Sequence, residues 1–311
     1  MTESLRRNSG PKTDADVRRH IADGLKPWGK VGVTTLDDSV ARLNADPVKY
    51  GPTLSQIDQF RARTRGAREF EIMSDRKGAY GRLIRQDRLL GPYGALALML
   101  ELHMDQKDRP DGTPYISHPL DVAIRVSDHL EKPNGDLLVA ALMHDSVEDQ
   151  AVKLVKMAPV GLYWGGLTDT QIALSVVGAK YGTRVRRIVS ALSNEDTDAI
   201  AIAEGINPKD KVAFTNRKNE LYAEHVGAAI QDPDVVLIKM FDFSANALRL
   251  DEVKDPERKL KLLAKYTPVV PRFIDRLNDT SRPVKVRGRD KILQELSEAH
   301  EKMTAQLEES K

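Results

Sequence analysis

The sequence contains no cysteine among its 311 residues. Thiol catalysis, thiolate metal sites and disulfide bonds are therefore excluded, and this fits a reducing compartment. No apolar run reaches the roughly 18 residues that span a bilayer. The polar start MTESLRRNSGPK also lacks the apolar core of a signal peptide. We therefore expect a soluble, cytoplasmic protein that does not bind a membrane.

A strong charge of one sign is also missing, because 48 basic side chains face 46 acidic ones and the net charge is +2. This balance argues against a general nucleic-acid coat protein, and we expect no nucleic-acid partner. The basic side chains do gather in residues 61–88, where nine of them stand against four acidic ones. A solvated helix face is the simpler interpretation of this segment, and a landing surface for an anionic ligand or partner is the alternative.

No strand pattern persists along the chain, whereas apolar residues recur at helical spacing, so the sequence predicts an all-α fold. We expect three parts: an N-terminal helical extension over 1–90, a helical domain over 91–275 and an amphipathic C-terminal helix in 276–311. Pro47 and Pro52 are expected to break the helices of 31–60, and the polar segment 193–215 is expected to be a loop. The expected helices of the central part cover these ranges: 91–106, 120–130, 137–149, 168–182, 184–192, 216–230, 234–250 and 257–277. Asn134 or Asp136 is expected to cap the third of these helices and Thr168 the fourth, residues 151–166 are expected to be irregular, and the last helix is expected to be interrupted near Pro268 and Pro271.

The stretch ALMHDSVEDQ, at 141–150, places ionisable groups at the end of an apolar helix. On one continuous helix, His144, Asp145, Glu148 and Asp149 share a side, because positions four apart stack. Burying several unpaired carboxylates is costly. A divalent cation neutralises them most simply, with imidazole nitrogen and carboxylate oxygen as its ligands.

Two further segments carry similar signals. Asp242 and Asn246 interrupt the apolar run DVVLIKMFDFSANALRL at 234–250, and His118 follows the rigid turn PYI. His118, His144, Asp145 and Asp242 therefore form a candidate set of four metal ligands that leaves coordination positions open. Glu148 and Asp149, one helical turn further on, are candidates to orient or deprotonate a water molecule.

Each signal also has a plain structural explanation. The dipeptide His144-Asp145 occurs often by chance, and a histidine such as His118 after a turn more often packs or caps a helix. Asp242 in a core helix can bond an arginine or a backbone group. His103, His129 and His225 suggest only structural roles. A purely structural helical protein with satisfied buried carboxylates therefore remains an alternative, although three separate signals together favour a metal site.

The motifs occur in a recognisable order: H-x-x-Q, G-T-P-Y-I-x-H-P-L-x-V-A, A-A-L-x-H-D-x-V-E-D and V-V-L-I-K-x-x-D-x-x-x-N-x-x-x-L. Over roughly residues 91–270 this resembles the HD-type alarmone hydrolases, which include the Rel/Spo hydrolase domain of the stringent response and the small alarmone hydrolases. The resemblance implies an α-helical HD domain that binds one Mn²⁺. It also implies removal of the 3′-pyrophosphate of (p)ppGpp, which gives GDP or GTP and pyrophosphate.

By position, the resemblance assigns metal binding to the four candidate ligands and activation of the hydrolytic water to Glu148 and Asp149. Asn246 matches a residue that lines the nucleotide site, and Tyr115 falls in the same turn as a tyrosine of the family, so the resemblance implies that both bind the substrate. An Arg-Lys pair usually precedes this turn, but here the stretch is QKDRPDG. Arg109 and Lys107 are therefore both candidates to grip phosphate, and the choice between them stays open.

Departures from the family pattern leave other functions open. The changed stretch QKDRPDG also suits an adenosine alarmone, (p)ppApp, or another nucleotide phosphate. The basic segment 61–88 and the C-terminal amphipathic helix suit an antitoxin or regulator that neutralises a cognate alarmone synthetase, and they also permit an oligomer. The family's D-R-L-H-N is D-F-S-A-N at 242–246, which keeps the candidate ligand and changes its surroundings.

Overall fold

The computed structural model describes residues 36–64, 91–132, 134–158 and 166–310, and every regular element within these ranges is a helix. The predicted all-α fold is thereby confirmed for the described part of the chain. Most of the basic segment 61–88 lies outside these residues. None of the described helices combines the length and the apolar content needed to cross a bilayer.

Two helices of the expected N-terminal extension pack against the rest of the molecule. Helix α2 (Leu36–Leu43) lies on α6 (Pro92–His103), and α3 (Pro47–Thr64) lies on α7 (Ser117–His129). The prediction that both prolines break this region is wrong, because Pro47 begins α3 and Pro52 lies inside it. Proline is favoured at the first helical position, where its missing N–H has no partner to lose.

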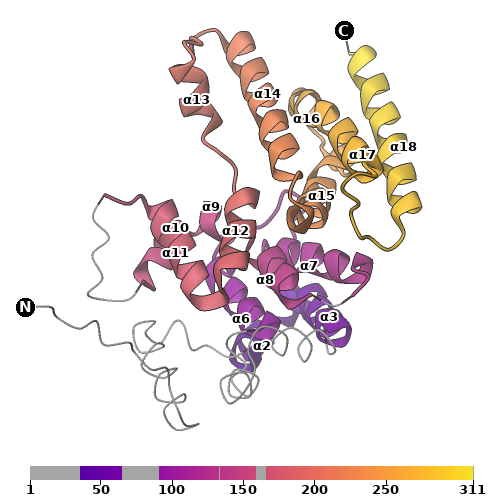
Figure 1. Cartoon of the computed structure of the whole chain (residues 1–311). Coiled ribbons are helices and arrows are strands. Elements are labelled where there is room, and N and C mark those ends of the chain that lie inside the picture. The colour runs from indigo at the N-terminus through magenta and orange to yellow at the C-terminus, as the bar shows by residue number, and fades with distance from the viewer. Residues whose placement is uncertain (1–35, 65–90, 133, 159–165, 311) are drawn as a thin grey trace, which may run out of the picture.

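The centre of the fold consists of helices that are apolar on nearly every side. Helix α6, α8 (Gly135–Met143) and α15 (Pro233–Ala247) are buried along most of their length. Helix α7 packs on both α8 and α15, and α6 packs on α8 (Figure 1). Such helices must be enclosed by others, and this arrangement brings the ends of α7, α8 and α15 together.

Helices α11 and α12 follow the predicted ranges, whereas α9 is separate from α8 and α10 lies where no helix was expected. Helix α9 is Ser146–Asp149, α10 is Ala151–Lys156, α11 is Asp169–Tyr181 and α12 is Thr183–Leu192. Of the two caps predicted for α8, Asn134 is the one observed, and Thr168 caps α11 as predicted, within a reciprocal capping box with Gln171. Gly182 ends α11 with a φ of 96°, a backbone conformation that favours glycine.

The prediction of a loop over 193–215 is wrong for most of that segment. It contains α13 (Thr197–Ala203) and the start of α14 (Lys211–Ala229), capped by Asp196 and Asp210. These polar residues begin helices because their carboxylates accept the N–H groups left unpaired at a helix start. The two helices pack on each other and rise above the α9–α12 group in Figure 1.

The C-terminal part forms a group of short helices next to α14. A 3₁₀ turn, η3 (Leu250–Glu252), leads to α16 (Pro256–Tyr266), and η4 (Thr267–Val269) joins it to α17 (Val270–Asn278). The predicted interruption near Pro268 and Pro271 is therefore confirmed. The last helix, α18, spans Arg289–Glu308 and packs on α16 and α17. It begins later than position 276 because Gly288, at φ 72°, precedes it.

Candidate metal centre

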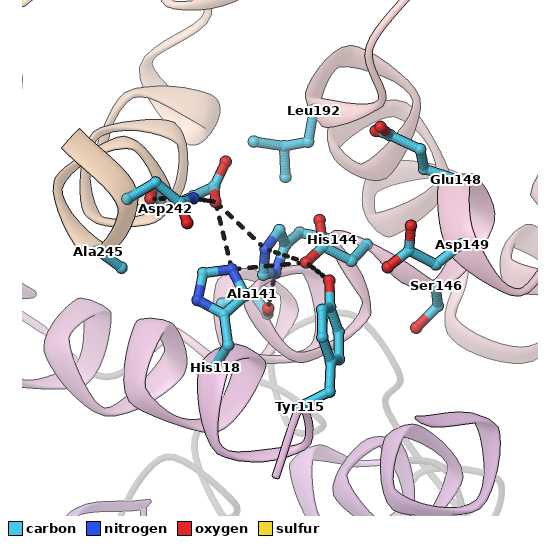
Figure 2. Close-up of polar contacts among 12 residues, drawn as sticks. Tyr115, His118, Ala141, His144, Ser146, Glu148, Asp149, Leu192, Asp242 and Ala245 are labelled. Atoms are coloured by element: carbon cyan, nitrogen blue, oxygen red, sulfur yellow. Dashed lines mark hydrogen bonds and ion pairs between the residues drawn. The ribbon is translucent and has the colours of Figure 1, made fainter. Parts of the chain in front are cut away.

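The structure brings the four predicted metal ligands together from three segments. His118 lies in the first turn of α7, His144 and Asp145 follow α8, and Asp242 lies near the end of α15. His118 Nε2 lies 3.3 Å from Asp242 Oδ1 and 3.5 Å from Asp145 Oδ2. His144 Nε2 lies 3.1 Å from Asp145 Oδ2 and 3.7 Å from Asp242 Oδ1. Figure 2 shows the side chains of His118, His144 and Asp242 pointing toward one another.

The donor set fits a cation. His118, His144 and Asp145 each offer one ligand atom, and these three atoms lie within 4.8 Å of one another. His144 Nδ1 lies 2.7 Å from the Ala141 carbonyl oxygen, so this nitrogen carries the proton and Nε2 presents its lone pair to the cluster. Nε2 is buried, and in the neutral ring it makes no hydrogen bond of good geometry among the described residues, since Asp145 Oδ2, at 3.1 Å, is also an acceptor. A buried acceptor without a partner is costly, and a cation removes that cost.

The His144 imidazole and the two carboxylates of the cluster shift one another's pKa values. Burial alone lowers the pKa of His144, but the Asp145 and Asp242 carboxylates outweigh burial and raise it well above its usual value. Burial raises the pKa of Asp145 and of Asp242, but the neighbouring imidazoles outweigh it and hold both pKa values below their usual range. Positive charge therefore stabilises the two half-buried carboxylates beside the imidazoles. A divalent cation can supply this charge in place of protons.

The expectation that one helix carries all the ionisable groups of ALMHDSVED is wrong. Helix α8 ends at Met143, and α9 begins only at Ser146, so His144 and Asp145 lie at the junction between two helices. Both side chains turn inward there. Glu148 and Asp149 lie on α9 beyond Asp145 and are exposed, so the expected burial of three carboxylates is limited to Asp145. The two exposed carboxylates lie to one side of the cluster (Figure 2).

Each of these two exposed carboxylates is held by an amide side chain. Gln106 Nε2 donates to Asp149 Oδ2 at 2.8 Å, and Gln106 Oε1 in turn lies 2.6 Å from Nδ1 of buried His103. Asn194 donates from its backbone N–H and its side-chain amide to Glu148. His103 was expected to be structural; burial lowers its pKa, which favours a neutral ring that carries a single N–H.

Tyr115 lies against the cluster. Its hydroxyl donates to Asp145 Oδ2 at 2.5 Å, and its ring stacks on His103. Burial and the charges of Asp145 and Asp149 raise the pKa of Tyr115 far above its usual value, so the hydroxyl keeps its proton and stays a donor. The resemblance suggested a substrate-binding role for Tyr115, but the observed contact is with a candidate metal ligand.

The two candidate phosphate-binding residues, Arg109 and Lys107, differ in the contacts that they make. The Arg109 guanidinium is 3.4 Å from the Ala245 carbonyl and 3.5 Å from Asn246 Oδ1, one helical turn beyond Asp242. Asn246 also donates to Asp242 Oδ1 at 3.2 Å. Lys107 is exposed, and the structure records no such contact for its ammonium. Of the two basic candidates, Arg109 is the one beside the cluster.

Two lysines near the cluster were not anticipated. Lys239 is 2% exposed on α15, and its ammonium lies 3.7 Å from Asp242 Oδ2. A single lysine inside the apolar run DVVLIKMF is a signal that sequence reasoning passed over. Lys265 on α16 lies over the Tyr222 ring at 4.2 Å, and burial and Lys239 lower its pKa although Glu148 and Asp242 act to raise it. No sequence pattern connects Lys265 to the distant motifs.

Known proteins resemble this chain over part of its length, although no family model matches it. A guanosine-3′,5′-bis(diphosphate) 3′-pyrophosphohydrolase of Aquifex aeolicus is 30% identical over 175 residues, which is 54% of this chain and 18% of that protein. The bifunctional (p)ppGpp synthase/hydrolase SpoT of Escherichia coli is 26% identical over 171 residues, 53% of this chain and 19% of SpoT.

A shorter relative gives a higher identity. The guanosine-3′,5′-bis(diphosphate) 3′-pyrophosphohydrolase MESH1 of Danio rerio is 46% identical over 75 residues, 22% of this chain and 42% of MESH1. The chain thus spans less than half the length of each of these three relatives. Their names confirm the resemblance to (p)ppGpp hydrolases that the motifs indicated.

Proposed function

We propose that this chain, a relative of the HD-type (p)ppGpp hydrolases, is a metal-dependent pyrophosphohydrolase that removes the 3′-pyrophosphate of (p)ppGpp. The products are GDP or GTP and pyrophosphate. The convergence of two imidazoles and two carboxylates from three distant segments carries the proposal. The names of the relatives support the substrate class, whereas nothing in them supports an adenosine alarmone or an antitoxin role.

We propose Mn²⁺ as the ion, with His118, His144, Asp145 and Asp242 as its protein ligands. A mixed set of imidazole nitrogens and carboxylate oxygens suits such a borderline cation, and the chain has no thiolate to favour a softer one. When bound, the cation supplies positive charge that acidifies a neighbouring water and stabilises negative charge on the phosphoryl oxygens.

The residues around the cluster then divide the work of hydrolysis. A water oxygen forms a bond to the phosphorus on the ribose 3′-oxygen, and the bond between that phosphorus and the 3′-oxygen breaks. Glu148 or Asp149 accepts the proton that the water loses, and solvent or the same carboxyl group returns a proton to the 3′-oxygen. The two carboxylates suit this work because they are exposed beside the cluster and each is fixed by an amide.

Positive groups near the cluster suit the phosphates of the substrate. We propose that Arg109 grips phosphate, because its fork-shaped guanidinium bonds two oxygens at once and lies beside Asn246. Asn246 then lines the nucleotide site, as the resemblance implies. Lys265 is a second candidate, since the structure records ring contacts but no ion pair for its ammonium among the described residues. Binding to a cognate alarmone synthetase and formation of an oligomer stay predictions.

The direct test is product identification. Protein loaded with Mn²⁺ is incubated with ppGpp, pppGpp and ppApp, and nucleotides and pyrophosphate are separated by anion exchange. We expect GDP or GTP and pyrophosphate from the guanosine alarmones, loss of turnover after chelation, and at least a 100-fold lower rate in Asp242→Asn. Asp290→Asn, whose side chain is 97% exposed on α18, is the matched control.

Two results would overturn the proposal. One is the absence of pyrophosphate release from either guanosine alarmone at full Mn²⁺ occupancy. The other is turnover of the Asp242→Asn protein at the rate of the Asp290→Asn control. Release from ppApp alone would retain the metal chemistry and change the substrate assignment.

A further inference from the structure

The carboxylate of Glu148 is exposed, yet it accepts three hydrogen bonds from a single residue, Asn194. The Asn194 backbone N–H donates to Glu148 Oε2 at 3.2 Å, and Asn194 Nδ2 lies 3.3 Å from Oε1 and 3.1 Å from Oε2. A free glutamate side chain samples many rotamers, and fixing one of them costs conformational entropy. These contacts restrict the position of the carboxylate before any substrate arrives.

Asn194 is itself anchored from inside the protein. The Lys239 ammonium lies 3.3 Å from Asn194 Oδ1 and 3.0 Å from the Leu192 carbonyl oxygen. The amide is therefore oriented without ambiguity, since its oxygen must face the ammonium and its NH₂ group must face the carboxylate. Lys239 is 2% exposed, so a rigid buried cation sets the direction of the amide that grips Glu148.

The same ammonium also faces the metal cluster. Lys239 Nζ lies 3.7 Å from Asp242 Oδ2, while the other oxygen of that carboxylate faces His118. One buried lysine thus contacts both a proposed metal ligand and the amide that holds a proposed proton acceptor. It thereby links the metal ligand and the amide across segments that lie 45 residues or more apart in the sequence.

We propose that Asn194, anchored by Lys239, is a positioning residue that holds Glu148 where it accepts the proton of the attacking water. The inference rests on the proposed hydrolase function. Loss of the amide leaves the metal ligands and the phosphate-binding groups in place, but it lets the carboxylate turn away. A small misplacement of a reacting group can cost about 100-fold in rate, so the effect falls on kcat rather than on KM.

The test compares Asn194→Ala with the wild-type protein loaded with Mn²⁺, using pyrophosphate release from ppGpp. We expect kcat to fall about 10- to 100-fold, with KM within about twofold and with unchanged Mn²⁺ affinity in calorimetry. Asn216→Ala, at an exposed asparagine of α14, is the matched control and keeps the wild-type kcat. A structural role would lower the melting temperature without separating kcat from KM.

A double-mutant cycle measures whether Asn194 affects kcat through Glu148. In a Glu148→Gln background, Asn194→Ala should lower kcat no further, because the group it positions has lost its function. An unchanged kcat in Asn194→Ala would overturn the inference, and so would a raised KM, which indicates direct contact with substrate. A wild-type protein that releases no pyrophosphate would instead overturn the proposed function itself.

Discussion

Three of the four candidate ligands are each held by a further group beside the cluster. The Ala141 carbonyl fixes the His144 ring, the Tyr115 hydroxyl donates to Asp145, and Lys239 lies against Asp242. Such outer contacts set the tautomer and the direction of a ligand, and their loss typically costs 10- to 100-fold in metal affinity. The cluster is therefore organised before a cation binds.

Tyr115→Phe tests this outer layer with the loss of one oxygen atom. The Asp145 carboxylate loses a donor at 2.5 Å and becomes free to turn, so we expect Mn²⁺ affinity to fall about 10-fold in calorimetry. Tyr50→Phe, on α3, serves as the control and should keep the wild-type affinity. Equal affinities in the two variants would show that the hydroxyl does not support the ligand.

The pH dependence of metal binding follows from His144. A proton and a cation compete for its Nε2, so Mn²⁺ affinity must fall as the pH falls. The Asp145 and Asp242 carboxylates raise the pKa of His144 despite its burial. The loss of affinity should therefore begin at a higher pH than for an ordinary histidine, whose pKa is about 6.5. Calorimetric titrations between pH 8.5 and pH 5.5 measure this, and an affinity that stays constant to pH 5.5 would contradict it.

Sequence reasoning reached the residues that interrupt apolar runs and missed those that hold them. His144, Asp145 and Asp242 were predicted because a buried charge stands out in an apolar helix. Asn194 and Lys265 gave no such signal, because exposed or half-exposed polar residues occur throughout the chain. Their relation to the cluster depends on how α12 and α16 pack, and local pattern does not determine that.

At the scale of the element, capping chemistry explains both the successes and the failures. Asn134 and Thr168 were read as helix starts because each precedes an apolar run. Asp196 and Asp210 cap helices in the same way, but polar residues are frequent throughout 193–215, so this segment was expected to be a loop. Helix α14 is stabilised by tertiary packing against α13 and α16, which its own sequence does not display.

Helix α18 offers a test of packing at this scale. Of its apolar stripe, Ile292, Leu296 and Met303 are buried, and Leu296 is 2% exposed. Leu296→Ala removes buried surface and leaves a cavity, so we expect the free energy of unfolding to fall by about 2–5 kcal/mol in chemical denaturation. Glu301→Ala, at an exposed position of the same helix, should change it by less than about 0.5 kcal/mol. A similar small change in both variants would mean that α18 contributes little to the fold.

At the scale of the whole molecule, one hydrophobic core extends from α2 to α18. The site lies within this core, where α7, α8 and α15 meet, so its geometry depends on helices that contribute no ligand. Helices α2 and α3 belong to the same core although they fall in the expected N-terminal extension. The division at residue 90 stays a prediction about the chain, but we expect residues 36–64 to unfold together with the helices that carry the site.

Phe60→Ala tests this coupling. Phe60 lies on α3 with no exposed surface and packs edge-on against Tyr93 of α6, with ring centroids 6.5 Å apart. Its truncation should lower the free energy of unfolding by about 3–5 kcal/mol. Circular dichroism and loss of bound Mn²⁺ should report the same shifted midpoint in urea, because a single core unfolds as one unit. Val48→Ala, at a 93% exposed position of α3, is the control and should leave the midpoint in place. Two separate transitions, with metal release unaffected by Phe60→Ala, would mean that α2 and α3 fold independently of the metal centre.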